Sequence, residues 1–102
     1  KSNANARPYY GICKDRLGVG IVDKSKMEEI SADLALQIQA IIRENSKRDW
    51  VKNLDLQNKM KSEIEDALFD ASTREGFKLS FETMDRILEE SLVTAKNRSG
   101  SQ

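Results

Sequence analysis

The chain contains no histidine, which removes the side chain that most often serves as a general base or a metal ligand near neutral pH. Its one cysteine, Cys13, excludes an internal disulfide framework and suits a reducing compartment. It has no apolar run long enough to cross a bilayer and no N-terminal segment of signal-peptide type. We therefore expect neither a membrane partner nor histidine-dependent catalysis.

An excess of charge of one sign is also missing, since 17 basic residues balance 17 acidic ones. Nonspecific attraction to nucleic acid or to an anionic membrane is therefore not indicated. Charged residues make up 33% of the chain and interleave as they do on solvated helix faces. The 102 residues suffice for one domain with one modest core.

The first half of the chain predicts two helices. Pro8 suits the first position of a short helix over residues 8–17, which Gly18 would end in the left-handed conformation. Ser25 and Glu28 form a capping box for a second helix over residues 26–44. Its apolar stripe consists of Met27, Ile30, Leu34, Ile38, Ile41 and Ile42. In the connector over residues 18–24, the apolar residues expected to cover the core are Val19, Ile21 and Val22.

The stretch from Trp50 to Leu68 carries the strongest helical periodicity. Trp50, the only tryptophan, precedes the stripe and is predicted to anchor the core. Either Asn53 or Asp55 can cap this central helix, which should last until about Thr73. The residues that share its apolar face are Leu56, Met60, Ile64, Ala67, Leu68 and Ala71.

A last helix follows the turn at Gly76, with Ser80 as its N-cap and fraying near Asn97. Its predicted buried stripe is Phe81, Met84, Leu88, Leu92 and Ala95, with Ile87 beside it. These patterns predict an all-α, bundle-like array of one short N-terminal helix and three longer amphipathic helices. The helical domain would span residues 8–98, between a disordered or expression-derived tail at 1–7 and a flexible tail at 99–102.

The residues offer no recognisable catalytic, cofactor-binding or metal site. Neighbouring acidic pairs lack the histidines of di-iron bundles and suit solvated faces. The glycines at 18–20 lack the Lys-Ser/Thr ending of a phosphate-binding loop. Cys13 has no histidine to activate it and is expected to be a small buried residue.

Basic residues gather around the Trp50 linker, at Lys47, Arg48, Lys52, Lys59 and Lys61. Such a group could contact phosphates, although Asp49, Asp55 and Glu63 lie among them and weaken the field. A helical nucleic-acid-binding module is therefore one interpretation. A general protein-interaction bundle is another.

Four segments carry a resemblance to a known family. They are YYGICKDRLG at 9–18, IIREN at 41–45, DWVKNLDLQNKMKSEIEDALFD at 49–70 and MDRILEESLVTAKNR at 84–98. Their order resembles the C-terminal helical region of the restriction and motor (R) subunit of type I restriction-modification enzymes. The pair Asp49-Trp50, followed by Asn-Lys-Met-Lys at 58–61, is the distinctive part. The similarity covers residues 8–98.

The resemblance implies a noncatalytic assembly domain of an ATP-dependent type I restriction endonuclease and DNA translocase in the bacterial cytoplasm. The nuclease and the ATPase, with its ATP and Mg²⁺, would lie elsewhere in the parent subunit. The implied partners are the methyltransferase and specificity subunits, and duplex DNA through the parent complex. The expected docking surface comprises Arg48, Lys52, Asn53, Lys59 and Lys61 beside the anchor Trp50.

Overall fold

The computed structural model describes residues 5–18, 20–21 and 23–100. The described residues form helices and connections without a strand, which confirms the predicted all-α fold. The elements in chain order are α1 (Arg7–Leu17), α2 (Lys24–Asn45), the 3-10 helix η1 (Trp50–Lys52), α3 (Leu54–Glu75) and α4 (Phe81–Gly100).

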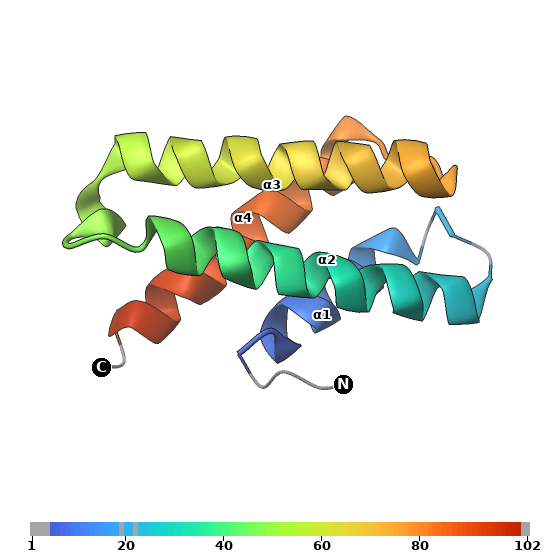
Figure 1. Ribbon diagram of the computed structural model, residues 1–102, viewed down its shortest axis with the longest axis horizontal. Helices are drawn as coiled ribbons and strands as arrows, with labels where there is room; N and C mark the ends of the chain where they lie inside the picture. Colours follow the sequence, from blue (N-terminus) through green and yellow to red (C-terminus); the bar gives the residue numbers. More distant parts are fainter. Residues whose placement is uncertain (1–4, 19, 22, 101–102) are drawn as a thin grey trace.

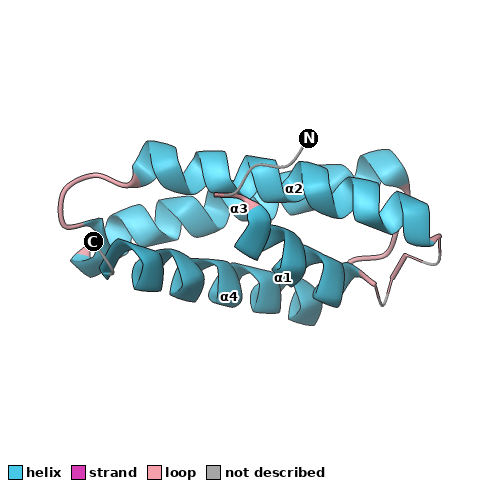
Figure 2. Cartoon of the chain, turned by 90° about the horizontal axis from the view of Figure 1, so that it is seen from below, coloured by secondary structure: helices cyan, strands magenta, loops and turns pink. Residues whose placement is uncertain are grey.

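The two longest helices, α2 and α3, lie side by side and run in opposite directions (Figure 1). Helix α4 crosses behind them, and the short α1 packs against α2 and α4 (Figure 2). Each helix turns its apolar stripe toward the common interior, as amphipathic helices of a small domain must. The fully buried large side chains include Leu17, Leu34, Ile38, Met60, Ile64, Leu68 and Ile87. The stripes predicted for α2 and α3 supply most of this core.

Helix α2 begins earlier than the predicted capping box places it. Asp23 is the N-cap, and its Oδ1 accepts a hydrogen bond from the backbone N–H of Lys26 at 3.1 Å. Ser25 therefore lies inside the first turn, and the predicted box with Glu28 is wrong. A carboxylate suits the positive end of the helix dipole better than a hydroxyl does, which favours the earlier start.

Gly18 does not adopt the predicted left-handed conformation, since its φ is −58°. Gly18 instead keeps right-handed helical angles. The N–H groups of Gly20 and Ile21 both donate to the carbonyl oxygen of Leu17, at 3.0 and 3.1 Å. Ile21 is buried against the core as expected. Val19 and Val22, predicted to cover the core with it, lie outside the described residues.

The ends of α3 and the start of α4 follow their sequence signals. Asn53, one of the two candidate caps, accepts a hydrogen bond from the N–H of Leu56 at 3.1 Å. Gly76 ends α3 with φ 74°, a conformation that glycine adopts without steric cost. Ser80 caps α4 by accepting from the N–H of Thr83 at 3.1 Å.

Phe81 is the clearest error in the predicted core, because its side chain is 81% exposed. It is the first residue of α4, at the rim of the bundle, where Phe77 and Leu79 of the preceding connection already pack against the core. Ile87, expected only beside the stripe, is fully buried in its centre. The stripe therefore starts at Met84.

The described helices reach slightly beyond residues 8 and 98. Ala6 is buried, and α1 begins at Arg7, so residues assigned to the N-terminal tail belong to the fold. Arg98 donates a hydrogen bond to the carbonyl oxygen of Asn5 at 2.8 Å and thereby joins the two ends of the domain. Helix α4 continues to Gly100. Residues 1–4 and 101–102 lie outside the described range.

Gly20 approaches another part of the backbone so closely that a side chain cannot fit. A Cβ placed there would lie 2.6 Å from the carbonyl oxygen of Lys78. We expect Gly20→Ala to lower the free energy of unfolding by about 1–3 kcal/mol, as overpacking does. Gly11→Ala is the matched control, because a Cβ in that helical position meets nothing within 4 Å. It should raise the stability by about 0.5–1 kcal/mol. Equal urea midpoints for the two variants would contradict this packing.

Candidate functional site

The connection between α2 and α3 forms a compact turn around Trp50. Asp49 has a left-handed backbone with φ 60°, and η1 follows it directly. The indole of Trp50 is only 5% exposed and belongs to the core. Burial of such a ring fixes the position of the short helix to which it is attached. We call residues 46–53 the Trp50 turn.

A buried amide of α3 holds this turn in place. The Nε2 group of Gln57 donates to the carbonyl oxygens of Trp50 and Val51, at 3.2 and 2.7 Å. The carbonyl oxygen of Trp50 also accepts from the N–H of Asn53 at 2.9 Å, and Gln57 itself is almost fully buried. The clamp therefore ties the shape of the turn to the first turns of α3.

A second buried amide joins the end of α2 to α3. Asn45 donates through Nδ2 to the carbonyl oxygen of Ile41 and to Oε1 of Glu63, at 2.8 and 3.0 Å. Its Oδ1 accepts from Nζ of Lys59 at 2.9 Å. Lys59 also lies 3.4 Å from a carboxylate oxygen of Glu63. All three polar side chains are thus engaged with one another.

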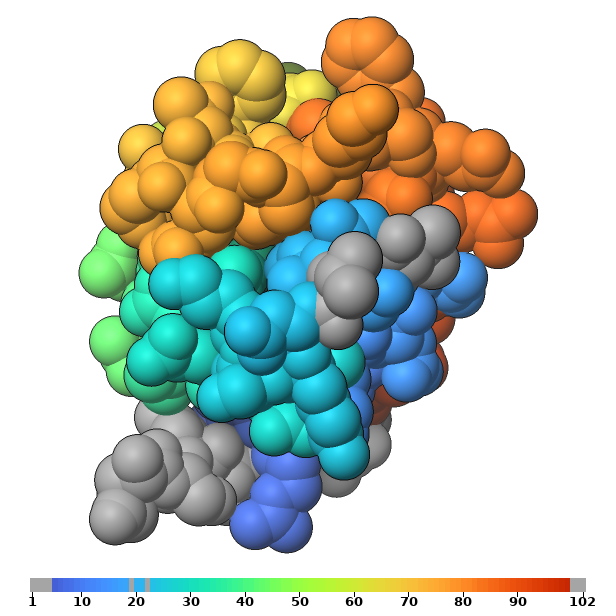
Figure 3. Space-filling view, turned by 90° about the vertical axis from the view of Figure 1, so that its right-hand side faces the viewer, coloured from blue at the N-terminus to red at the C-terminus, as the bar shows by residue number. Residues whose placement is uncertain are grey.

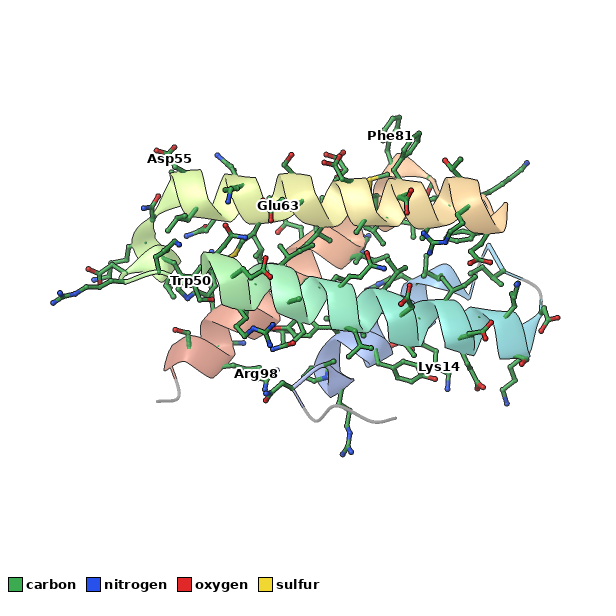
Figure 4. The ribbon with its side chains drawn as sticks, viewed as in Figure 1. Lys14, Trp50, Asp55, Glu63, Phe81 and Arg98 are labelled. Carbon is green, nitrogen blue, oxygen red and sulfur yellow. The ribbon has the colours of Figure 1, made fainter. Side chains whose placement is uncertain are left out.

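A cleft of about 510 Å³ opens beside the Trp50 turn. It is bordered by the end of α2, by η1, by the end of α4 and by Tyr9 of α1, and Figure 4 shows Trp50 and Arg98 in this region. The basic residues along it are Arg43, Lys47, Arg48, Lys52 and Arg98. Among the described residues that line it, the acidic one is Asp49. We call this feature the basic cleft.

One of these cations is fixed by its neighbours. The guanidinium of Arg98 bonds to the carbonyl oxygen and to Oδ1 of Asn5, at 2.8 and 3.2 Å. Burial raises the pKa of Tyr9, while the charge of Arg98 and a hydrogen bond to it oppose that rise. Tyr9 is therefore neutral at physiological pH, and the charge of Arg98 is left uncompensated by this contact.

The structure separates the residues expected to form one docking surface. Arg48 and Lys52 line the basic cleft, and Asn53 lies at its edge with its side chain engaged as the cap of α3. Lys59 belongs to the buried-amide network, and Lys61 lies on the other side of α3, with Nζ 3.9 Å from a carboxylate oxygen of Glu89. Lys59 and Lys61 point apart because side chains two positions apart on a helix differ in direction by about 200° around its axis.

Two basic residues of the cleft were missed by the sequence interpretation. Arg43 lies near the end of α2, one turn before Lys47, and this spacing is visible in the sequence. Arg98 reaches the cleft only because α4 crosses the bundle, which no local signal encodes. The cleft thus combines residues that are distant along the chain.

Metal sites, membrane-spanning helices and reactive thiols are absent from the described residues. No group of three acidic, cysteine or histidine residues among them is arranged as a metal site requires. None of the described helices combines the length and apolar character needed to cross a bilayer. Cys13 is buried, and desolvation raises its pKa to about 12. Its thiol therefore stays protonated, which is the state that neither attacks nor binds metal.

Comparison with known proteins does not extend these observations. No family model, no curated protein and no solved structure matches the chain.

The burial of Cys13 predicts that its thiol reacts slowly with disulfide reagents. In the folded chain we expect an aromatic disulfide reagent at neutral pH to modify the thiol only as fast as the domain unfolds, because the thiolate is both scarce and covered. In urea the same thiol should react at the rate of a free cysteine, which serves as the control. Rapid modification of the native chain would show that Cys13 is accessible.

The Gln57 clamp also makes a measurable prediction. Gln57→Leu leaves the carbonyl oxygen of Val51 without its donor, so the free energy of unfolding should fall by about 1–3 kcal/mol. Emission from the single tryptophan should shift to longer wavelength as the turn loosens. Gln37→Leu is the matched control, since that amide donates to the exposed carboxylate of Asp33, its one hydrogen-bond partner among the described residues. An unchanged emission spectrum in Gln57→Leu would exclude the clamp.

Proposed function

We propose that this chain is a noncatalytic assembly domain of the motor subunit of a type I restriction-modification enzyme. It would dock that subunit onto the core of methyltransferase and specificity subunits. The proposal rests on the family resemblance of residues 9–18, 41–45, 49–70 and 84–98. In the fold, these segments include most of the residues that build the Trp50 turn and the basic cleft.

The observation that carries the proposal is the basic cleft. The whole chain is neutral, yet five cations and one carboxylate lie along this cleft among the described residues. The buried Trp50 and the Gln57 clamp fix the backbone of the turn, and so they fix the positions from which Arg48 and Lys52 extend. Preorganised arginine and lysine side chains beside an aromatic anchor favour recognition of an acidic protein surface.

The catalytic functions belong to other parts of the parent protein under this proposal. ATP and Mg²⁺ would serve its motor domains, and its separate nuclease would cut duplex DNA. The cell compartment would be the bacterial cytoplasm, where the free thiol of Cys13 would stay reduced. The described residues would attach the motor subunit to the methyltransferase and specificity subunits.

The same cleft favours a second candidate function, which is direct contact with duplex DNA. Lysine and arginine side chains bind phosphates without regard to sequence, and each contact releases a counterion. Binding of this kind weakens steeply with added salt. A neutral chain is an unusual binder of DNA, so we rank this function second.

Charge reversal at the cleft separates the candidates. We expect Lys47→Glu, Arg48→Glu and Lys52→Glu together to abolish co-purification of the full motor subunit with the methyltransferase and specificity subunits. ATP hydrolysis that depends on the assembled complex should fall in parallel. The melting temperature should change little, because these side chains are exposed. Lys59 is left intact, since its loss would disturb the Asn45 network.

The matched control reverses three solvent-facing cations remote from the cleft, at Lys14, Lys24 and Lys26. It changes the net charge equally and should assemble normally. Normal assembly of the cleft variant would refute docking through this cleft. The isolated chain should also be titrated with labelled duplex DNA at about 50 and 200 mM salt. Tight, salt-sensitive binding that the cleft variant loses would establish the second candidate instead.

A further inference from the structure

Two phenylalanines of this small domain are left in solvent. Phe69 of α3 is 66% exposed, and Phe81 at the start of α4 is 81% exposed. Figure 4 shows the ring of Phe81 pointing away from the bundle beside the second half of α3. An exposed aromatic ring loses the free energy that burial supplies, so a pair of them marks a surface that another molecule can cover.

The turn between α3 and α4 brings the two rings to neighbouring parts of the surface. Lys61 of α3 and Glu89 of α4 face each other between the two helices, with Nζ and Oε2 3.9 Å apart. Phe69 lies eight residues after Lys61, and Phe81 lies eight residues before Glu89. Because the chain turns back between α3 and α4, both steps lead toward the connection over residues 76–80, so the two rings lie on neighbouring parts of the two helices. We call this pair and its surroundings the Phe69–Phe81 patch.

Uncompensated carboxylates flank the patch. Glu65 and Asp66 lie four and three residues before Phe69, and Asp85 lies four residues after Phe81. All three are exposed, and within the described residues none of them forms an ion pair. The nearest opposing pairs, Lys61–Glu89 and Arg86–Glu82, are already internally balanced. Lys78, three residues before Phe81, is an exposed cation that forms no ion pair within the described residues. Three carboxylates against one lysine leave the patch apolar at its centre and net negative at its rim.

This charge pattern selects among possible occupants. A second copy docked about a two-fold axis would bring the same carboxylates together, and like charges in an interface cost several kcal/mol. A partner with basic residues around apolar ones instead gains contacts at both the centre and the rim. The patch also lies on a different part of the molecule from the basic cleft, as the separate positions of Phe81 and Trp50 in Figure 4 show.

We infer that the Phe69–Phe81 patch is a second docking surface, and that its partner is a basic amphipathic helix of another protein. Two apolar side chains one turn apart on that helix would cover the rings, and flanking lysine or arginine side chains would face Glu65, Asp66 and Asp85. Figure 3 shows the end of the bundle where atoms from the end of α3 and the start of α4 (orange) stand above α2 (cyan).

A synthetic peptide of leucine and lysine at amphipathic helical spacing serves as the probe. We expect it to bind the full chain by fluorescence anisotropy, and Phe69→Ala with Phe81→Ala to weaken binding at least about tenfold. Both side chains are exposed, so the melting temperature should hardly change. Glu65→Gln, Asp66→Asn and Asp85→Asn together should weaken binding and remove much of its salt dependence.

Leu54→Ala is the matched control, because that side chain is 70% exposed at the opposite end of α3. It should bind the peptide as the parent does. A second peptide, with glutamate in place of every lysine, should not bind at the patch. The inference fails if the phenylalanine variant binds the basic peptide as tightly as the parent does. It also fails if sedimentation shows a dimer that Phe81→Ala dissociates, since the occupant would then be a second copy.

Discussion

The buried contact between the Trp50 turn and α3 is the constraint on which the rest of this structure depends. The indole of Trp50 is buried in the core, and the amide of Gln57 donates to the carbonyl oxygens of Trp50 and Val51 in the turn. Together they fix the point at which the chain reverses from α2 into α3. Once that reversal is fixed, the two long apolar stripes face each other and α4 crosses over them.

The same constraint organises the charge of a neutral chain. The turn places Arg48 and Lys52 beside the end of α4, whose Arg98 is held by Asn5. Elsewhere on the molecule, carboxylates remain free around the exposed rings of Phe69 and Phe81.

Periodicity predicted the fold well because it reflects burial directly. The stripes of α2 and α3, the cap at Asn53 and the turn at Gly76 all follow from local spacing and residue type. Sequence patterns gave wrong predictions of burial where the position of a residue in the bundle decides whether it is covered. Phe81 continues the stripe of α4 in sequence, but it lies beyond the helices that cover that stripe. The candidate site was predicted only in part, since Lys61 faces α4 and Arg98 arrives from the far end of the chain.

Hydrogen exchange of the motor subunit, measured alone and then bound to the methyltransferase and specificity subunits, tests the proposed docking most directly. We expect new protection of backbone amides in residues 43–53, where the end of α2 and the Trp50 turn border the basic cleft. Amides in the first turns of α2, remote from the cleft, should exchange unchanged and serve as the internal reference. Unaltered exchange at residues 43–53 on assembly would contradict docking through the Trp50 turn.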